Sequence, residues 1–375
     1  MNMEAARKFI YRNARPLDLA RWQFLFEDGS REAVLTALAA YQNEDGGFGH
    51  GLEPDCLNPN SSPVQTWAAT EIIKEVDLCN RSHPIIQGIL KYLETTDEFD
   101  GHVWANTIES NDDYPHAPWW SYSKPEEPDY NPTASLIGFI LKYAEKDSPL
   151  YDTAIRLAKE AYAFFEKSFP LDSMHTAACF VELYEYLCEC NIKDIINLDE
   201  FKKLLQEQIS HMLTQDTSVW STQYVCKPSL FIKSKESVFY SENKELCDFE
   251  KNHISETQNE DGTWNITWDW GGYPEQCHVS RNWWKSDWII KNVKFYEAME
   301  GKKAKNSYSL NINKVWRYGF AGIAVALGGM IFSDLLGNFF NGMDYGSASV
   351  LGICMYLCIV VVTCTGVIVS KIDEK

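Results

Sequence analysis

The chain of 375 residues is long enough for one large domain with additions, or for two domains. A hydrophobic fraction of 45% and an aromatic fraction of 14% are typical of a packed globular protein and argue against intrinsic disorder. Residues 1–299 hold 27 Lys and Arg against 48 Asp and Glu, a net charge of −21 that repels phosphate backbones and makes nucleic acid a poor partner.

The 11 cysteines are scattered along the chain and form no CxxC pair. An odd, dispersed set of this kind indicates reduced thiols in the cytosol, and neither a disulfide framework nor a zinc site. Residues 1–7 contain no apolar signal segment.

Apolar residues recur every three to four positions along most of residues 1–299, which predicts a series of helices with almost no strand. A serine pair followed by Pro63 is a strong helix start, because Ser61 or Ser62 can cap the first amides and proline needs no N–H there. The expected helices lie at 4–27, 31–41, 63–75, 84–95, 132–144, 150–168, 173–190, 198–214, 242–257 and 280–299.

Alternate helices differ in composition. Small and apolar residues predominate in the helices at 63–75, 132–144 and 174–188, whereas the helices between them are more charged. A closed ring of helical hairpins needs this alternation, because its inner helices face their neighbours and its outer helices face water. We therefore predict an all-α fold, in which residues 1–300 form an α/α toroid of roughly five or six hairpins.

One turn sequence occurs twice. It reads QNEDGGF at 42–48 and QNEDGTW at 258–264, with weaker copies at 99–104 and 216–220. Glycine permits a tight turn, the glutamine side chain can satisfy amides at the next helix start, and the aromatic ring covers the junction.

The pattern Gln-x-x-x-Gly-x-Trp resembles the QW repeat of the squalene-cyclase and prenyltransferase α/α-toroid superfamily. The copy at 258–264 matches it in full, and the copy at 42–48 has Phe in place of Trp. The resemblance implies a toroid and a substrate that is an isoprenoid or another lipid-soluble molecule. The chain lacks the Asp-x-Asp-Asp acid of the cyclases, and the adjacent Asp55 and Cys56 depart from the Asp-x-Cys zinc spacing of the transferases. It is most similar to the uncharacterised single-toroid branch.

His50, Glu53 and Asp55 lie within six residues, just before the apolar helix at 63–75. Glu53 and Asp55 are candidate catalytic residues, as an acid/base pair or as ligands of a divalent ion, with His50 as a further ligand or a substrate contact. No cofactor is identified, although a divalent metal is possible. The structural alternative is that the carboxylates pair with arginines or cap the next helix.

Two aromatic segments are candidates for substrate binding. The proline-rich loop at 112–120 contains His116, Trp119 and Trp120, and it forms either a wall of a cavity or a hydrophobic plug. The second segment contains Trp268 and Trp270, with Trp283 further on; its rings can stabilise carbocations, stack on sugars, or simply fill the core. Asp269 lies among these rings, in an expected apolar surrounding that favours a protonated carboxyl, and is a third candidate catalytic residue.

Two apolar stretches follow, at 318–336 and 350–369, each about long enough to cross a bilayer. We predict a basic linker at 301–317 and a two-helix transmembrane hairpin at 318–370. Lysines and arginines flank the hairpin but are absent from its connecting loop, which places both ends and the toroid in the cytoplasm. A buried helical hairpin is the alternative.

These features predict a membrane-anchored protein, similar to prenyltransferases and terpene cyclases, that acts on an isoprenoid or other lipid-soluble substrate in an aromatic-lined cavity. Its partners are then membrane lipid or the isoprenoid itself. A carbohydrate-active toroid, either a hydrolase or a lyase, is one alternative, and a non-catalytic lipid-binding module is another. An open polar groove would favour the carbohydrate hypothesis, and a closed apolar cavity the other two.

Overall fold

The computed structural model describes residues 1–124 and 128–302 and, beyond them, residues 328, 331, 344, 346–347, 350, 352–357 and 360. The chain divides into two compact units, Met1–Asn306 and Ser307–Lys375. In the described residues regular structure is helical, with isolated bridges but no β-strand. The predicted all-α class is confirmed.

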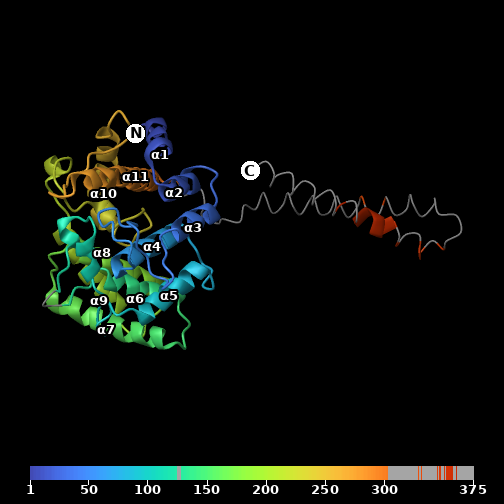
Figure 1. The fold of residues 1–375 in the computed structure, drawn as a ribbon, viewed down its shortest axis with the longest axis horizontal. Coiled ribbons are helices and arrows are strands. Elements are labelled where there is room, and N and C mark those ends of the chain that lie inside the picture. The colour runs from blue at the N-terminus through green and yellow to red at the C-terminus, as the bar shows by residue number, and fades with distance from the viewer. Residues whose placement is uncertain are drawn as a thin grey trace. The chain divides into compact units, whose positions relative to one another are not determined.

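The helices of the first unit follow one another along the chain (Figure 1). They are α1 (Met3–Asn13), α2 (Pro16–Phe26), α3 (Arg31–Ala39), α4 (Pro63–Glu75), α5 (Pro84–Thr95), α6 (Thr133–Tyr143), α7 (Pro149–Ser168), α8 (Met174–Glu189), α9 (Leu198–Met212), α10 (Lys244–Glu256) and α11 (Pro274–Met299). Long loops separate α3 from α4, α5 from α6 and α9 from α10. The candidate residues near position 50 and position 116 lie in the first two of these loops.

Most of the predicted helices match the observed bounds to within two residues, but two do not. The single helix predicted at 4–27 is two helices, because Pro16 has no N–H to continue α1 and favours extended backbone at Arg15 before it. The last helix begins at Pro274, six residues earlier than predicted, because proline fits the first helical turn. Of the two predicted caps of α4, Ser62 is the real one, since its hydroxyl accepts a hydrogen bond from Gln65 N at 3.2 Å.

The first copy of the repeated turn packs on a neighbouring helix. Gln42 Nε2 donates to Gly46 O at 2.9 Å and to Ile85 O of α5 at 3.2 Å. Gly46 has a φ of +95°, and a Cβ atom at this position would lie 2.1 Å from Gly88 O of α5. Both the backbone conformation and the close approach therefore require glycine.

The second copy repeats these contacts at the other end of the unit. Gln258 Nε2 donates to Gly262 O at 3.0 Å and to Asn2 O at 3.3 Å, and Gly262 has a φ of +90°. Gln258 Oε1 also accepts from Asn2 N, as predicted for a glutamine that satisfies an amide at a helix start. For Gln42 that prediction is wrong, because its side chain donates to carbonyl oxygens.

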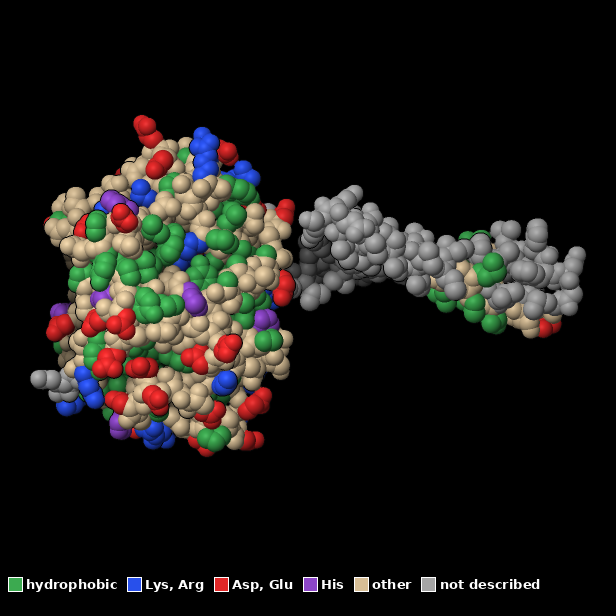
Figure 2. All heavy atoms as spheres, viewed as in Figure 1, with side chains coloured by type: hydrophobic (Ala, Val, Ile, Leu, Met, Phe, Trp, Pro, Cys, Tyr) green, Lys and Arg blue, Asp and Glu red, His purple; other side chains and the backbone are tan. Residues whose placement is uncertain are grey.

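Because Asn2 caps α1, the second turn joins the end of the unit to its beginning. Helix α11 packs on α1, α2 and α10, so the first and last helices lie side by side (Figure 1). Helix α6 packs on α4, α7 and α8, and all of its residues except Lys142 are buried. Acidic side chains are spread over the outer surface around α7 and α9 (Figure 2).

A buried ion network connects three helices of the unit. Arg21 of α2 donates to Asp18 at 3.1 Å, to Glu75 of α4 at 2.7 Å and to Asp287 of α11 at 2.9 Å. Lys291 also pairs with Asp287, at 2.8 Å. Each charge has an opposite partner, which offsets the cost of removing it from water.

The predicted membrane hairpin at 318–370 and most of the linker at 301–317 lie outside the described residues, apart from a few positions between 328 and 360. Among the residues that the structure does describe, no helix combines the length and apolar character needed to cross a membrane.

We predict that Gly46→Ala destabilises the helical unit by at least about 3 kcal/mol, because a Cβ there meets the α5 backbone in addition to its unfavourable φ. Gly101→Ala is the matched control: its φ is +99°, but nothing lies within 4 Å, so it should cost only about 1 kcal/mol. Urea unfolding of both variants measures the difference, and equal losses would show that the close approach to α5 is unimportant.

Candidate functional site

The centre of the candidate site is the buried carboxylate of Asp55, in the loop between α3 and α4. Its Oδ2 accepts a hydrogen bond from Trp268 Nε1 at 3.0 Å, and its Oδ1 accepts from Trp270 Nε1 at 2.9 Å. The hydroxyl of Ser280, in α11, also donates to Oδ1. Asp55 itself is only 2% exposed. The structure thus brings together one predicted catalytic residue and two predicted substrate-binding tryptophans.

Glu53 lies beside Asp55 and is also buried. The backbone N–H of Asp55 donates to Glu53 Oε2 at 2.5 Å. Burial, followed by the charge of Asp55, raises the pKa of Glu53 well above its usual range. The two predicted catalytic carboxyls therefore have different surroundings: burial favours the protonated form of Glu53, whereas Asp55 accepts hydrogen bonds from three donors.

An arginine fixes this segment from the other side. Arg15 Nη1 donates to the carbonyl oxygens of Gly51 at 2.9 Å and Leu52 at 3.2 Å. Its Nε donates to Asp18 at 2.7 Å, and its guanidinium lies 5.2 Å from the ring centroid of Trp283. The predicted substrate-binding residue Trp283 therefore packs against Arg15, the residue that holds this loop.

His50 does not join Glu53 and Asp55. It has a φ of +60°, its side chain is exposed, and a ring nitrogen bonds Asn43 Oδ1 at 2.8 Å, within the repeated turn. In the parts of the chain that the structure describes, no three His, Cys, Asp or Glu residues are grouped so as to hold a metal ion. The hypothesis of a metal site built from His50, Glu53 and Asp55 has no support in this geometry.

The loop predicted at 112–120 packs directly on the Asp55 loop. Ala117 N donates to Asp55 O at 2.8 Å, and His116 forms an isolated bridge with Cys56. The ring of His116 bonds Tyr114 O at 2.7 Å and Ser121 Oγ at 3.0 Å, so this histidine ties its own loop together.

The two tryptophans of this loop have different surroundings. Trp120 is half-buried and packs with Ala117, Trp270 and Cys277, whereas Trp119 is 47% exposed. Of the two predicted substrate contacts, only Trp120 thus lies against residues that surround Asp55.

The expectation of an apolar surrounding for Asp269 is wrong. Its side chain is 64% exposed, and it accepts from Arg281 Nη2 at 2.6 Å. Trp268 and Trp270 both donate to Asp55, whereas the side chain of Asp269 between them faces water.

Trp268 is part of an aromatic cluster that sequence reasoning did not assemble. The centroid of its ring lies 5.3 Å from that of Tyr224, 5.4 Å from that of Trp284 and 5.5 Å from that of Trp288. Burial, followed by the charges of Glu53 and Asp55, raises the pKa of Tyr224 to about 12. Trp284 and Trp288 are four residues apart in α11, the spacing of one helix face, which is the sequence signal that could have found them.

Polar groups border this aromatic cluster. His175 at the start of α8 bonds the Tyr224 hydroxyl at 3.0 Å. Burial and the nearby charge of Lys291 lower the pKa of His175. Lys291 is 61% exposed and lies 5.5 Å from the ring of Trp284. The aromatic cluster is therefore edged by a histidine and an ammonium group.

A second pair of carboxyls, also missed from the sequence, is Glu71 in α4 and Glu182 in α8. Glu182 accepts hydrogen bonds from Ser135 of α6 and, at 3.5 Å, from Trp67 Nε1, which lies one helical turn before Glu71 in α4. Burial and the charge of Glu182 raise the pKa of Glu71 to about 8. These residues come from separate helices, so no local spacing indicates the pair.

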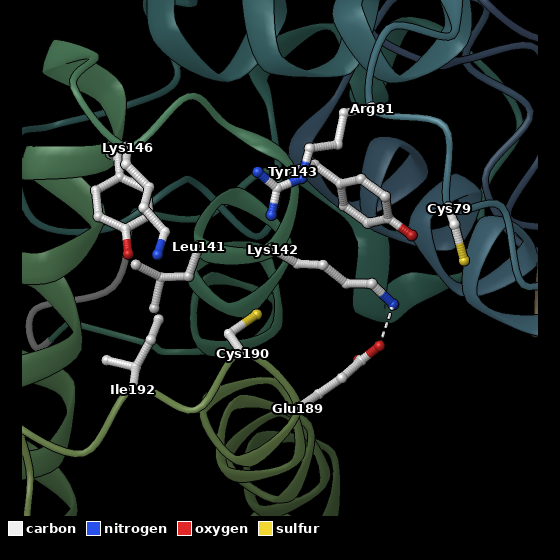
Figure 3. Close-up of a pocket in the computed structure, with 10 residues that line it drawn as sticks. Cys79, Arg81, Leu141, Lys142, Tyr143, Lys146, Glu189, Cys190 and Ile192 are labelled. Atoms are coloured by element: carbon white, nitrogen blue, oxygen red, sulfur yellow. Dashed lines mark ion pairs between the residues drawn. The ribbon is translucent and has the colours of Figure 1, made fainter.

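Two pockets lie outside these clusters. One, of about 260 Å³, is at the ends of α6 and α8 and is lined by Cys79, Arg81, Lys146 and others; Lys142 pairs there with Glu189 at 2.7 Å (Figure 3). The other, of about 400 Å³, is on α11 beside segment 265–266.

Compared with protein families, curated proteins and solved structures, the chain matches none.

We predict that Asp55→Ala destabilises the unit by about 3–5 kcal/mol, because three donors lose their charged acceptor inside the protein. Asp269→Ala is the control, since it removes an exposed carboxylate from the residue that directly follows Trp268, and it should change stability by less than about 1 kcal/mol. Urea unfolding of the two variants gives the comparison. A small loss for Asp55→Ala would show that the carboxylate does not hold these segments together.

We also predict that Glu71→Gln makes stability less sensitive to alkaline pH. The pKa of Glu71 is raised on folding to about 8, so its favourable contribution is complete below its unfolded pKa and is lost as pH rises towards 8. Between about pH 5 and pH 9, the wild type should lose on the order of 3 kcal/mol more of its free energy of unfolding than the variant does. Unfolding curves across this range test it, and parallel pH profiles would contradict it.

Proposed function

We propose that residues 1–300 form an α/α toroid, with the Asp55 loop and the aromatic cluster near its axis. Two observations support the ring. The equivalent turns at 42–48 and 258–264 pack on α5 and α1 in the same way, and α11 packs on α1 and α2. A repeat whose last copy contacts the first helix is what a closed ring requires.

We further propose that this protein is an enzyme, similar to prenyltransferases and terpene cyclases, acting on an isoprenoid or another lipid-soluble substrate. The observation that carries the proposal is the contact between Trp268 and Asp55, which joins an aromatic cluster to a pair of carboxyls. The rings of Trp284, Trp288 and Tyr224 offer apolar area to an isoprenyl chain, and their faces attract a developing positive charge.

Glu53 is the proposed proton donor. Burial raises its pKa, which favours the protonated form that a proton donor needs, and the neighbouring Asp55, which accepts hydrogen bonds from three donors, is placed to stabilise positive charge that forms nearby. Asp55 is then a positioning and electrostatic residue. Lys291 at the edge of the cluster is placed to contact an anionic part of the substrate.

A membrane anchor fits this substrate. The stretches at 318–336 and 350–369 are the proposed transmembrane hairpin, which would hold the helical unit at the cytoplasmic face, where a substrate dissolved in lipid is accessible.

A carbohydrate-active enzyme is the second candidate. It is favoured by the polar border of the aromatic cluster, where His175 bonds the Tyr224 hydroxyl and Lys291 lies beside Trp284, because aromatic faces with polar neighbours also stack on sugars. Lys291, which pairs with Asp287, also makes the surroundings more polar than an isoprenoid requires.

The test is mass spectrometry of small molecules that co-purify with the full-length chain in a mild non-ionic detergent. We expect a polyprenyl compound from the wild type and at least about tenfold less from Trp284→Ala, which removes a ring from the aromatic cluster. Trp119→Ala, which removes an exposed ring outside that cluster, should not reduce the recovery. Saccharide without any polyprenyl compound would reject the isoprenoid proposal and favour the second candidate.

A further inference from the structure

The pocket of about 400 Å³ on α11 has an unusual lining for so acidic a protein. Its volume is in the range of small-molecule sites. It is lined by amide, imidazole, guanidinium and ammonium groups and one aliphatic side chain, and by no carboxylate: Asn265, Ile266, His278, Arg281, Asn282 and Lys285. In a segment with a net charge of −21, a pocket without an acidic lining residue repels an anion less than the surface around it does.

The pocket shares no lining residue with the aromatic cluster. Residues 278, 281, 282 and 285 recur at intervals of three and four and share one face of α11. Trp284, Trp288 and Lys291 recur at the same intervals on another face. The inference below therefore does not depend on the proposed function.

Several donors remain available in this pocket. Lys285 forms no ion pair with any residue that the structure describes. The Nε atom of Arg281 is buried and has no hydrogen-bond partner within the described part of the chain, although Nη2 donates to Asp269 and to Trp268 O. Asn259 donates to Asn265 Oδ1 at 3.1 Å, which leaves the amide N–H groups of Asn265 to donate elsewhere.

We propose that this pocket binds a phosphate group, carried either by a soluble small molecule or by a lipid. A guanidinium supplies a fixed fork of donors to phosphate oxygens, an ammonium adds a point charge, and the Asn265 amide adds a neutral donor. Asp269 keeps Arg281 in place from outside the pocket, since it is not among the lining residues.

The experiment is isothermal titration calorimetry on the full-length chain in a non-ionic detergent at low ionic strength. Inorganic pyrophosphate is the soluble probe, and dihexanoyl phosphatidic acid below its micelle concentration is the lipid probe. We expect saturable binding of at least one probe, with Kd raised about fivefold by Lys285→Gln, as for the loss of one partly exposed charge pair. Lys285→Arg should restore the affinity.

Lys203→Gln is the matched control, because it removes the same charge from the exposed surface of α9. Its Kd should equal that of the wild type. Stronger binding of pyrophosphate would identify a soluble phosphate compound, and stronger binding of the lipid probe a headgroup; either supports the site. Absence of saturable binding, or an equal loss in Lys203→Gln, would overturn the proposal.

Discussion

The Asp55 carboxylate connects parts of the chain that are 213 to 225 residues apart, through Trp268, Trp270 and Ser280. A carboxylate buried this deeply is tolerated only when hydrogen bonds replace its water. Here the donors come from α11 and the segment before it. The loop between α3 and α4 is consequently fixed to the end of the helical unit, and the loop at 112–120 packs on the same place.

This arrangement also sets the chemistry of the neighbouring groups. Burial and, after it, the charge of Asp55 raise the pKa of Glu53. The same principle acts between Glu71 and Glu182. Carboxyl groups are costly to bury, so two pairs of them inside one helical unit are the main physical reason to expect a functional interior.

The sequence indicated part of the candidate site. Asp55, Trp268 and Trp270 are each predicted as site residues, but on separate grounds, and only the fold shows that they touch. His50 and Asp269 carry the right chemical groups but point elsewhere, His50 to its own turn and Asp269 to Arg281. Such orientations depend on one or two backbone dihedrals, which composition and spacing do not specify.

The sequence by itself determined the all-α class, most helix bounds and the repeated turn, because periodicity, proline, serine caps and glycine act within a few residues. Tertiary structure alone decided which charges are buried and paired. Glu71 meets Glu182, and Arg21 meets Asp287, across 111 to 266 residues of chain. Burial and Coulomb energies depend on distances in space, and neighbours in space are not fixed by neighbours in sequence.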